Sequence, residues 1–226
     1  YSSSASVYGD AAEVPMSETH PFNNRNFYGA TKIAGEAMCR AFHDRYGLSY
    51  VGLRYMNVYG PHQDQTAAYT GVIPIMLNKI DANEAPTING DGSQAYDFIY
   101  VEDVVQAALL AVESPVANQK TYIVTDGQEY STSDVCSRIC QILGRRMPRW
   151  AVPLPLLRLV ARTGDLIGAG LRRRFIFNSA LLHRLTSSAW YSSGKIQREL
   201  GYKPAHTIED ALTDTMEQHR RSQRAR

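Results

Sequence analysis

Residues 27–55 constrain the fold more than any other part of the chain. Apolar residues recur there at the helical period, at Ile33, Ala34, Ala37, Met38, Ala41 and Phe42. This pattern ends near Tyr46, and Gly47 stands where helices commonly stop in a left-handed conformation. A short, mostly apolar run over 49–55 then predicts a strand buried in a parallel sheet. A helix followed by a buried strand is typical of an α/β protein.

Tyr28 and Lys32 lie four residues apart in this predicted helix. Residues at this spacing lie on the same face, so the phenol and the ammonium can address one point in space. A cation beside a phenol favours the phenolate, and Lys32 would in this way help Tyr28 to release and recover a proton. Alone, such a pair is more often a surface tyrosine beside a solvated lysine. The neighbouring motifs must decide between the two readings.

Three further motifs accompany the stretch Phe27-Tyr28-Gly29-Ala30-Thr31-Lys32. They are Tyr1-Ser2-Ser3-Ser4-Ala5-Ser6-Val7-Tyr8-Gly9, Leu53-Arg54-Tyr55-Met56-Asn57-Val58-Tyr59-Gly60-Pro61, and Gly90-Asp91-Gly92-Ser93-Gln94-Ala95-Tyr96-Asp97-Phe98 with the run that follows to Asp103. With these motifs, the chain from Tyr1 to about Asp210 resembles the extended short-chain dehydrogenase/reductases, and within them the NAD-dependent epimerase/dehydratase family of the UDP-glucose 4-epimerase type. The resemblance implies an α/β fold, with a Rossmann-type doubly wound parallel sheet and a smaller, mainly helical substrate lobe.

The resemblance also implies site residues. Ser4 would bond the reacting sugar oxygen and relay its proton with Tyr28, and Lys32 would bond the ribose of the nicotinamide. These three are the expected catalytic residues. Ser2 and Tyr55 would join Tyr28 and Lys32 in binding NAD, the expected cofactor.

The expected substrate is a nucleotide-diphosphate sugar, such as a UDP-hexose. By the family pattern Asn57 contacts it, although an Asn in an Asx-turn is the alternative. The backbone near Val72 and Thr87-Ile88 would hold the base. Tyr96 stands where the family has an arginine for the diphosphate. Because a phenol offers only one neutral donor, we expect another cation to supply the charge, Arg184 first and then Arg172, Arg173 and Arg174.

The reaction class depends on Ala5 and Ser6. In the family's 4,6-dehydratases the corresponding residues include an Asp and a Glu that remove water. A methyl and a hydroxyl are not bases strong enough for that step. The sequence therefore favours C4 epimerisation through a 4-keto sugar. Two alternatives stay open: an NAD(P)-dependent 4-ketosugar reductase or sterol-dehydrogenase-like oxidoreductase, and an inactive nucleotide-sugar-binding remnant.

The resemblance divides the chain into a Rossmann domain over 1–60 and 96–126, a substrate lobe over 61–95 and 127–218, and a basic tail over 219–226. The glycine fingerprint Gly-x-Gly-x-x-Gly, which cradles the pyrophosphate of the dinucleotide, does not occur in the sequence. We expect roughly 100 residues of the family's first β–α units to be missing ahead of Tyr1.

Several elements follow from local signals. Pro74 in a first turn predicts a helix from Val72, and Tyr96 to Val101 should return to the Rossmann sheet as a strand. Asp103 is a candidate N-cap for the next helix. Further signals are a strand over 121–124, a capping box at Ser131 and Asp134, and a cap at Thr207.

Composition and the resemblance give the remaining expectations. The chain has 226 residues and a net charge of +2, which says little about its partners. We expect no nucleic-acid partner. Three cysteines without a ligand spacing indicate a reducing compartment, so we expect a cytoplasmic protein without a metal. We also expect a homodimer. Arg158, Arg162 and Asp165 interrupt the apolar stretch 151–174, which excludes a membrane span. A packed lobe helix is favoured there over an interfacial amphipathic helix.

Overall fold

The computed structural model describes residues 1–63, 71–86, 88–89, 92–147, 151–170, 177–179, 181–182 and 188–224. The chain forms two compact units. Unit 1 contains Tyr1–Gly71, Asp97–Glu129 and Ala189–Arg226, and unit 2 contains Val72–Tyr96 and Tyr130–Ser188. The expected α/β fold class is confirmed, and its parallel sheet lies in unit 1.

Three parallel strands form the sheet of unit 1, in the order β1-β2-β7. They are β1 (Ser2–Ser4), β2 (Val51–Tyr55) and β7 (Lys120–Val124), and Ser4 is in register with Tyr55, which is in register with Val124. Alternate residues of these strands belong to two different apolar clusters. Leu53, Tyr122 and Val124 pack with Ala107 and Ala111, whereas Ile123 packs with Val7, Met16 and Ile33. The alternation is that of a sheet covered on both faces.

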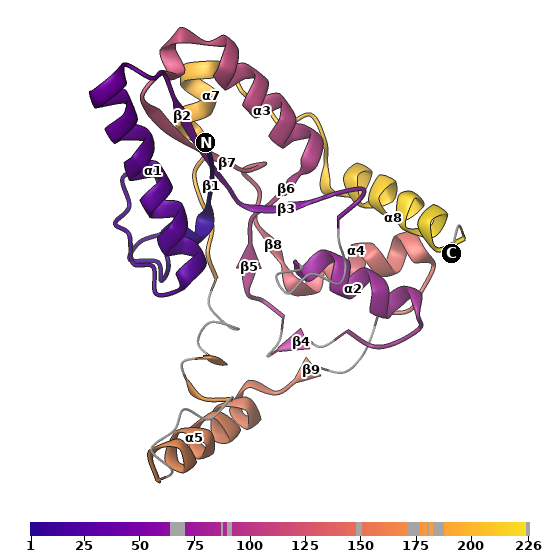
Figure 1. Ribbon diagram of the computed structural model, residues 1–226. Coiled ribbons are helices and arrows are strands. Elements are labelled where there is room, and N and C mark those ends of the chain that lie inside the picture. The colour runs from indigo at the N-terminus through magenta and orange to yellow at the C-terminus, as the bar shows by residue number, and fades with distance from the viewer. Residues whose placement is uncertain are drawn as a thin grey trace. The chain divides into compact units, whose positions relative to one another are not determined.

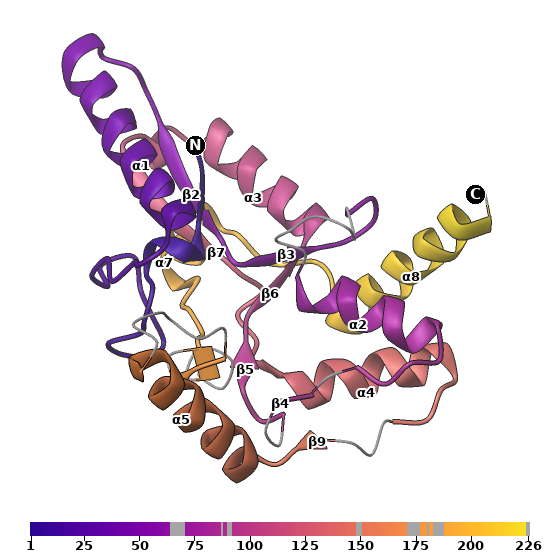
Figure 2. The ribbon, with the colours of Figure 1, turned by 60° about the horizontal axis from the view of Figure 1, so that its bottom comes forward.

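The helices of unit 1 cover these two faces. The helix α1 (Phe27–Tyr46) carries Ile33 and lies on one side of the sheet, while α3 (Val101–Glu113) carries Ala107 and Ala111 and lies on the other (Figures 1 and 2). Around them are the 3₁₀ turns η1 (Ala5–Val7) and η2 (Pro115–Ala117), and the helices α7 (Gly194–Leu200) and α8 (Ile208–Arg224). The predicted stop of α1 is confirmed, because Gly47 has φ 71° and donates to the His43 carbonyl.

Two predictions about residues 96–103 are wrong in detail. The run 96–101 does not join the three-stranded sheet as one strand: Ala95–Tyr96 forms β5, and Phe98–Tyr100 forms β6, which pairs with β3 (Asn57–Tyr59). Asp103 is not the N-cap of α3, because Tyr100 occupies that position. The buried Asp103 carboxylate instead accepts bonds from Ala205 N at 2.8 Å and from His206 N at 3.4 Å, and so holds the chain ahead of α8.

The division of the chain also differs from the expected one near its end. Residues 189–218 were assigned to the substrate lobe, but they belong to unit 1. There Ile196 and Tyr202 are buried in the same cluster as Leu53 and Tyr122. The expected tail over 219–226 is helical as far as Arg224, and His219 is buried on α8. The buried apolar residues of α8 lie before this segment, at Ile208, Ala211, Leu212 and Met216, and the helix continues from them through the basic residues.

The loop over 10–26 is tied to the end of the chain by backbone bonds. Met16 N donates to Trp190 O, and Ser192 N donates to Met16 O, both at 2.9 Å. Met16 itself is fully buried. The polar, proline-bearing loop that leads into α1 is therefore part of the core of unit 1.

A buried ion pair lies between the sheet and α1. Arg54 of β2 donates to both carboxylate oxygens of Glu36 on α1, at 2.9 and 2.7 Å, and both side chains are less than a tenth exposed. Ser3 donates to the same carboxylate at 2.5 Å, and Arg54 also donates to the Tyr8 hydroxyl at 2.8 Å. This network joins β1, β2, α1 and η1, so it fixes where α1 lies on the sheet.

Unit 2 has short strands and three longer helices. Its helices are α2 (Val72–Asp81), α4 (Thr132–Leu143) and α5 (Leu154–Gly170). The strand β4 (Ile88–Asn89) pairs with β9 (Ala151–Val152), and β5 pairs with β8 (Tyr130–Ser131). The predicted capping box is confirmed: Ser131 accepts from Asp134 N at 3.0 Å, and Asp134 accepts from Ser131 N at 3.3 Å. None of the helices in the described ranges is long and apolar enough to cross a membrane.

Candidate functional site

The site predicted from sequence lies at the carboxyl edge of the unit 1 sheet. Ser4, Tyr55 and Val124 are neighbours in register and are the last residues of their strands. In open parallel sheets, ligands bind outside this edge because the strands end there and hand over to loops and helix N-termini. Ser4 and Tyr55 are both half-buried, which leaves part of each side chain accessible at this edge.

Ser4 has a local structural duty. It is the N-cap of η1, in an extended conformation, and its Oγ accepts a bond from Ser6 N at 3.2 Å. The same hydroxyl donates to Ser6 Oγ at 3.3 Å. A serine hydroxyl can accept two bonds and donate one, so these contacts orient Ser4 without filling its capacity for a further partner.

The start of α1 is held close to η1. Asn26 caps α1 by accepting a bond from Gly29 N at 2.7 Å. Gly29 is buried, and a Cβ added there would collide with the Ser6 carbonyl oxygen and with the Asn24 side chain. Only glycine allows this approach between the two backbones. Tyr28, the preceding residue, is thereby fixed beside the turn that Ser4 begins.

Lys32 lies one helical turn beyond Tyr28 and reaches the sheet. Its Nζ is 5.4 Å from the centroid of the Tyr28 ring, and it donates to the Ser2 carbonyl at 2.9 Å. Tyr28 is 44% exposed, so its phenol is open to a solute from outside. The helical spacing predicts that both residues share one helix face, and the structure adds a bond from the ammonium to Ser2, the first residue of β1.

Asn57 is the first residue of β3, just beyond the end of β2. Its Nδ2 donates to the backbone carbonyl of Asp97 at 2.6 Å, so this distant segment of the same chain, and not an Asx-turn, orients the amide. Its exposed side chain leaves the amide oxygen as the atom most suited to meet a ligand. The side chain of Tyr55, two residues earlier, packs partly against the apolar cluster around Leu53.

Asp97 is a buried carboxyl group that the sequence reasoning did not single out. It is 1% exposed and accepts a bond from Tyr191 N at 2.6 Å. Burial raises the pKa of Asp97 to about 8; the Tyr191 bond opposes this rise, and the nearby Asp126 and Glu129 add to it. In the sequence, the position of Asp97 between Tyr96 and the apolar run Phe98-Ile99-Tyr100 could have indicated a buried carboxyl group. Asp97 holds the returning segment 189–192 near the site.

Three of the expected substrate residues lie in unit 2. Val72 begins α2 and is exposed, whereas Ile88 is buried in β4, opposite Ala151. Tyr96 is half-buried in β5, opposite Tyr130, and burial raises the pKa of its phenol. Thr87, Arg172, Arg173, Arg174 and Arg184 lie outside the described residues.

A cavity of about 410 Å³ lies in unit 2 and contains none of the predicted site residues. It is lined by the C-terminal ends of α2 and α4, with Glu84, Arg145 and Arg146 at its wall. Because none of the predicted site residues lines it, we assign it to the packing of α2 on α4. Geometry and register, rather than cavity size, identify the candidate site.

The described residues contain no group of three or more His, Cys, Asp or Glu that is placed to hold a metal ion. The three cysteines are free thiols in the structure. Two of them, Cys136 and Cys140, are buried on α4, and burial raises the pKa of Cys136 to about 12. A thiol that stays protonated is a poor nucleophile, so these residues serve the core of unit 2.

Relatives of known name indicate the family of this chain. The chain is 35% identical to UDP-glucose 4-epimerase of Mycolicibacterium smegmatis over 143 residues, which are 63% of this chain and 45% of that protein. It is also 28% identical to dTDP-glucose 4,6-dehydratase of Xanthomonas campestris pv. campestris over 212 residues, which are 93% of this chain and 54% of that protein. The chain thus spans about half the length of these curated relatives.

A solved structure and a family model agree with these relatives. The crystal structure of UDP-glucose 4-epimerase with UDP-glucose from Thermotoga maritima matches with a TM-score of 0.77 and 27% identity, over 98% of this chain and 63% of that one. The model of the NAD dependent epimerase/dehydratase family matches residues 1–125, which include Ser4, Tyr28, Lys32 and Asn57. This chain belongs to the NAD-dependent epimerase/dehydratase family.

Proposed function

We propose that the protein inverts the C4 centre of a nucleotide-diphosphate sugar, a UDP-hexose, through a 4-keto sugar, with NAD as cofactor. The observation that carries this proposal is the contact at Gly29. It brings the Tyr28–Lys32 pair against the turn capped by Ser4, at the carboxyl edge of a parallel sheet. The relatives named above, with UDP-glucose or dTDP-glucose in their names, support a nucleotide sugar.

The donors at this edge suit a dinucleotide. Lys32 Nζ donates to the Ser2 carbonyl, and an ammonium has three protons to give. Lys32 would hold ribose hydroxyls, with Ser2, Tyr28 and Tyr55 beside the nicotinamide. When bound, NAD supplies the site that accepts and returns the hydrogen of the sugar carbon.

The proton is the part of the reaction that these residues handle. Tyr28 takes the proton of the C4 hydroxyl as the carbonyl forms and returns it after the keto sugar has turned over. Ser4 donates to the same oxygen once its hydroxyl proton has turned away from Ser6 Oγ, and it keeps that oxygen at the phenol. The Lys32 ammonium lies 5.4 Å from the centroid of the Tyr28 ring, so a positive charge stands beside the group that carries the proton.

The substrate contacts are proposed from the family pattern. We assign the sugar to Asn57, through its amide oxygen, and the base to the backbone near Val72 and Ile88. Tyr96 would give one neutral donor to the diphosphate, and Arg184 would supply the positive charge.

Positions 5 and 6 favour epimerisation over loss of water. Both lie in η1, where Ser6 N is bound to Ser4 Oγ and Ala5 packs against the cluster of Val7 and Tyr8. The neighbouring carboxylates already have partners: Glu36 binds Ser3 and Arg54, and Glu18 accepts from Ile123 N at 3.0 Å. Both carboxylates are therefore engaged by donors of unit 1.

Product analysis tests the reaction. The protein as the cell makes it is incubated with NAD and UDP-glucose, and the sugar is followed by chromatography and NMR. We expect the C4 epimer, with no net NADH and no 6-deoxy product. A 4-keto-6-deoxy sugar would refute the argument from Ala5 and Ser6, and stoichiometric consumption of NADH or NADPH would assign the chain to the reductases.

Tyr28→Phe tests the proton relay. Turnover should fall by roughly 10³-fold or more, since general acid–base groups contribute about 10²–10⁴, while UDP-sugar binding stays nearly unchanged. Tyr46→Phe is the matched control, because Tyr46 ends the same helix and is 72% exposed. Near-normal kcat in Tyr28→Phe would show that another group is the base.

Arg184→Ala tests the assignment of the diphosphate. We expect UDP to bind more weakly by about 2 kcal/mol, on the scale of one charge-assisted bond, as measured by calorimetry with UDP alone. Arg221→Ala is a control, because Arg221 is exposed on α8 and pairs with Glu217. Unchanged affinity both in Arg184→Ala and in a triple alanine variant of Arg172, Arg173 and Arg174 would mean that the diphosphate is held otherwise.

We further place the protein in the cytoplasm as a homodimer. The three free thiols suit a reducing compartment. Met38, Phe42 and Tyr46 form an exposed apolar stripe on α1, of the kind that a second copy covers. Sedimentation of Phe42→Glu beside the parent chain tests this proposal, and an unchanged sedimentation coefficient would count against a dimer through α1.

A further inference from the structure

The charge of this chain is concentrated in one segment. Residues 145–174 contain eight arginines and one aspartate, with no lysine or glutamate, and so carry a net charge of +7. The other residues contain sixteen basic and twenty-one acidic side chains, for a net charge of −5. The near-neutral total therefore hides a strongly basic segment in an acidic protein.

The helix α5 occupies the middle of this segment and has two apolar faces. Ala161 and Gly164 are buried, and Leu154, Leu157 and Gly168 are half-buried, at the spacing of one helix face. A second set of apolar side chains is exposed, between 45% and 75%: Leu156, Leu159, Val160, Leu166 and Ile167. These also recur at intervals of three and four, so they form a continuous outer face.

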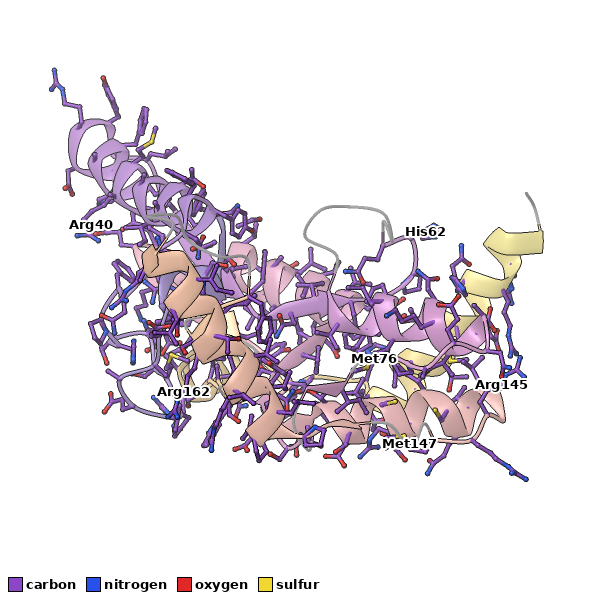
Figure 3. All side chains as sticks on the ribbon, turned by 90° about the horizontal axis from the view of Figure 1, so that it is seen from below. Arg40, His62, Met76, Arg145, Met147 and Arg162 are labelled. Carbon is purple, nitrogen blue, oxygen red and sulfur yellow. The ribbon has the colours of Figure 1, made fainter. Side chains whose placement is uncertain are left out.

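Arginines border this outer face. Arg162 follows Leu159 by three residues and precedes Leu166 by four, so it lies beside both on the helix. Arg158 stands one turn before Arg162, and both are exposed. Figure 3 shows the Arg162 side chain extending outward from the α5 ribbon. The outer face thus combines leucines with cations at its edge, the pattern of a helix that lies in a membrane interface.

The helix α3 provides an internal comparison. It also exposes apolar side chains at helical spacing, at Val105, Leu109 and Val112. The charged residues of α3 are Glu102, Asp103 and Glu113, all of them acidic. Of these two helices, only α5 combines an exposed apolar face with cations. An anionic surface would therefore attract α5 and repel α3.

We propose that α5 binds the surface of an anionic lipid bilayer. Its outer leucines enter the interface, and Arg158 and Arg162 extend their side chains to the phosphate groups, while the basic residues on either side of α5 add attraction at longer range. This inference is independent of the proposed reaction. It gives the outer face of α5 an occupant that matches both its apolar character and its charge.

Vesicle binding tests the proposal with the full 226-residue chain. We expect the chain to sediment with phosphatidylcholine vesicles in which roughly a third of the lipid is phosphatidylglycerol, and not with pure phosphatidylcholine, because the surface attraction of each arginine depends on anionic lipid. Raising the salt from about 0.05 to about 0.5 M should release most of the bound chain, since the screening length falls several-fold.

Paired variants separate the two contributions. Replacing both arginines, Arg158→Gln with Arg162→Gln, should lower vesicle affinity about 30-fold, from ~1 kcal/mol for each basic residue at the surface. Leu159→Ser with Leu166→Ser should lower it at least tenfold. Leu109→Ser on α3 is the matched control, because Leu109 and Leu159 are 56% and 61% exposed. Thermal unfolding of each variant verifies that it is folded.

A second readout comes from Trp150, which precedes α5 by four residues in the chain. With Trp190→Phe as the background, the emission of Trp150 should shift to the blue when anionic vesicles are added. The proposal is overturned if vesicle binding is absent, or if it is the same in the α5 variants as in the parent chain. Concentration-dependent self-association that Leu159→Ser abolishes, without vesicle binding, would assign the face to a second copy of the chain instead.

Discussion

Unit 1 and unit 2 use their charged residues in opposite ways. In unit 1, Arg54, Glu36, Asp97 and Asp103 are buried and bonded, and they tie distant segments to the sheet. In unit 2 the arginines of α5 are exposed at the edge of an apolar face. The buried polar groups of unit 1 hold segments of the chain in place on the sheet. The exposed arginines of α5 lie beside apolar side chains, where we propose that they bind a membrane surface.

The largest test of this contrast is Arg54→Ala. The change leaves the Glu36 carboxylate buried without its cation, and it should lower the free energy of unfolding by about 3–5 kcal/mol. Urea denaturation measures the loss. The double variant Arg54→Met with Glu36→Leu removes both charges and should recover most of it, because apolar residues of similar volume often replace a buried pair without cost.

Hydrogen exchange sharpens the same test. In Arg54→Ala, amides of β1, β2 and α1 should exchange faster, because the network that joins these elements is broken. Loss of protection confined to α4 of unit 2 would contradict the assignment of the pair to the core of unit 1.

Gly29→Ala tests how closely α1 must approach η1. The added methyl meets the Ser6 backbone, which cannot move aside as a side chain can, so we expect a destabilisation of about 2 kcal/mol. Turnover should fall further than stability accounts for, because Tyr28 shifts with the helix. Gly47→Ala is the control for a glycine whose added methyl meets no atom within 4 Å but whose φ is 71°.

A smaller loss of stability is expected when a helix cap is removed in either unit. Ser131→Ala removes the cap of α4 in unit 2 and should cost about 1 kcal/mol. Thr207 accepts a bond from Asp210 N at 3.3 Å at the start of α8 in unit 1, so Thr207→Ala is the matched change. Equal losses in thermal unfolding are expected, since a cap acts locally. A loss several times larger in one unit would mean that its helix depends on the cap for tertiary contacts.

Asp97→Asn should have its smallest effect on stability below pH 3.8, because the protonated carboxyl and the amide are then both neutral and both can accept from Tyr191 N. The ordinary pKa is 3.8, and burial raises it to about 8 in the folded protein. The proton is therefore bound more tightly in the folded state, and the stability that it contributes is present below pH 3.8 and is lost as pH rises to about 8. The stability difference between parent and variant should change over that window. A difference that does not depend on pH would contradict a raised pKa.

Local signals in the sequence predicted the elements well where one residue decides the geometry. Gly47 stops α1, Pro74 lies in the first turn of α2, and Ser131 with Asp134 caps α4. Each of these depends only on neighbours within one helical turn, so the chain itself carries the information. The same holds for the shared face of Tyr28 and Lys32.

Long-range partners could not be predicted in this way. The position of Asp103 at the start of an apolar helix predicts an N-cap. Its carboxylate instead accepts a bond from Ala205 N, 102 residues later in the sequence. The partners of Arg54 and Asp97 likewise depend on which segments the fold brings together. The roles of the site residues remain predictions until the variants are measured.

The pairing of Met16 with residues 190–192 has a consequence for synthesis on the ribosome. All of unit 2 is translated between these two segments, so its helices can form while the loop over 10–26 still lacks its partner. Met16, fully buried in the finished protein, stays exposed for that interval. The nascent chain therefore lacks these two backbone bonds and the burial of Met16 until residues 190–192 emerge, and it would need a chaperone most during that stage.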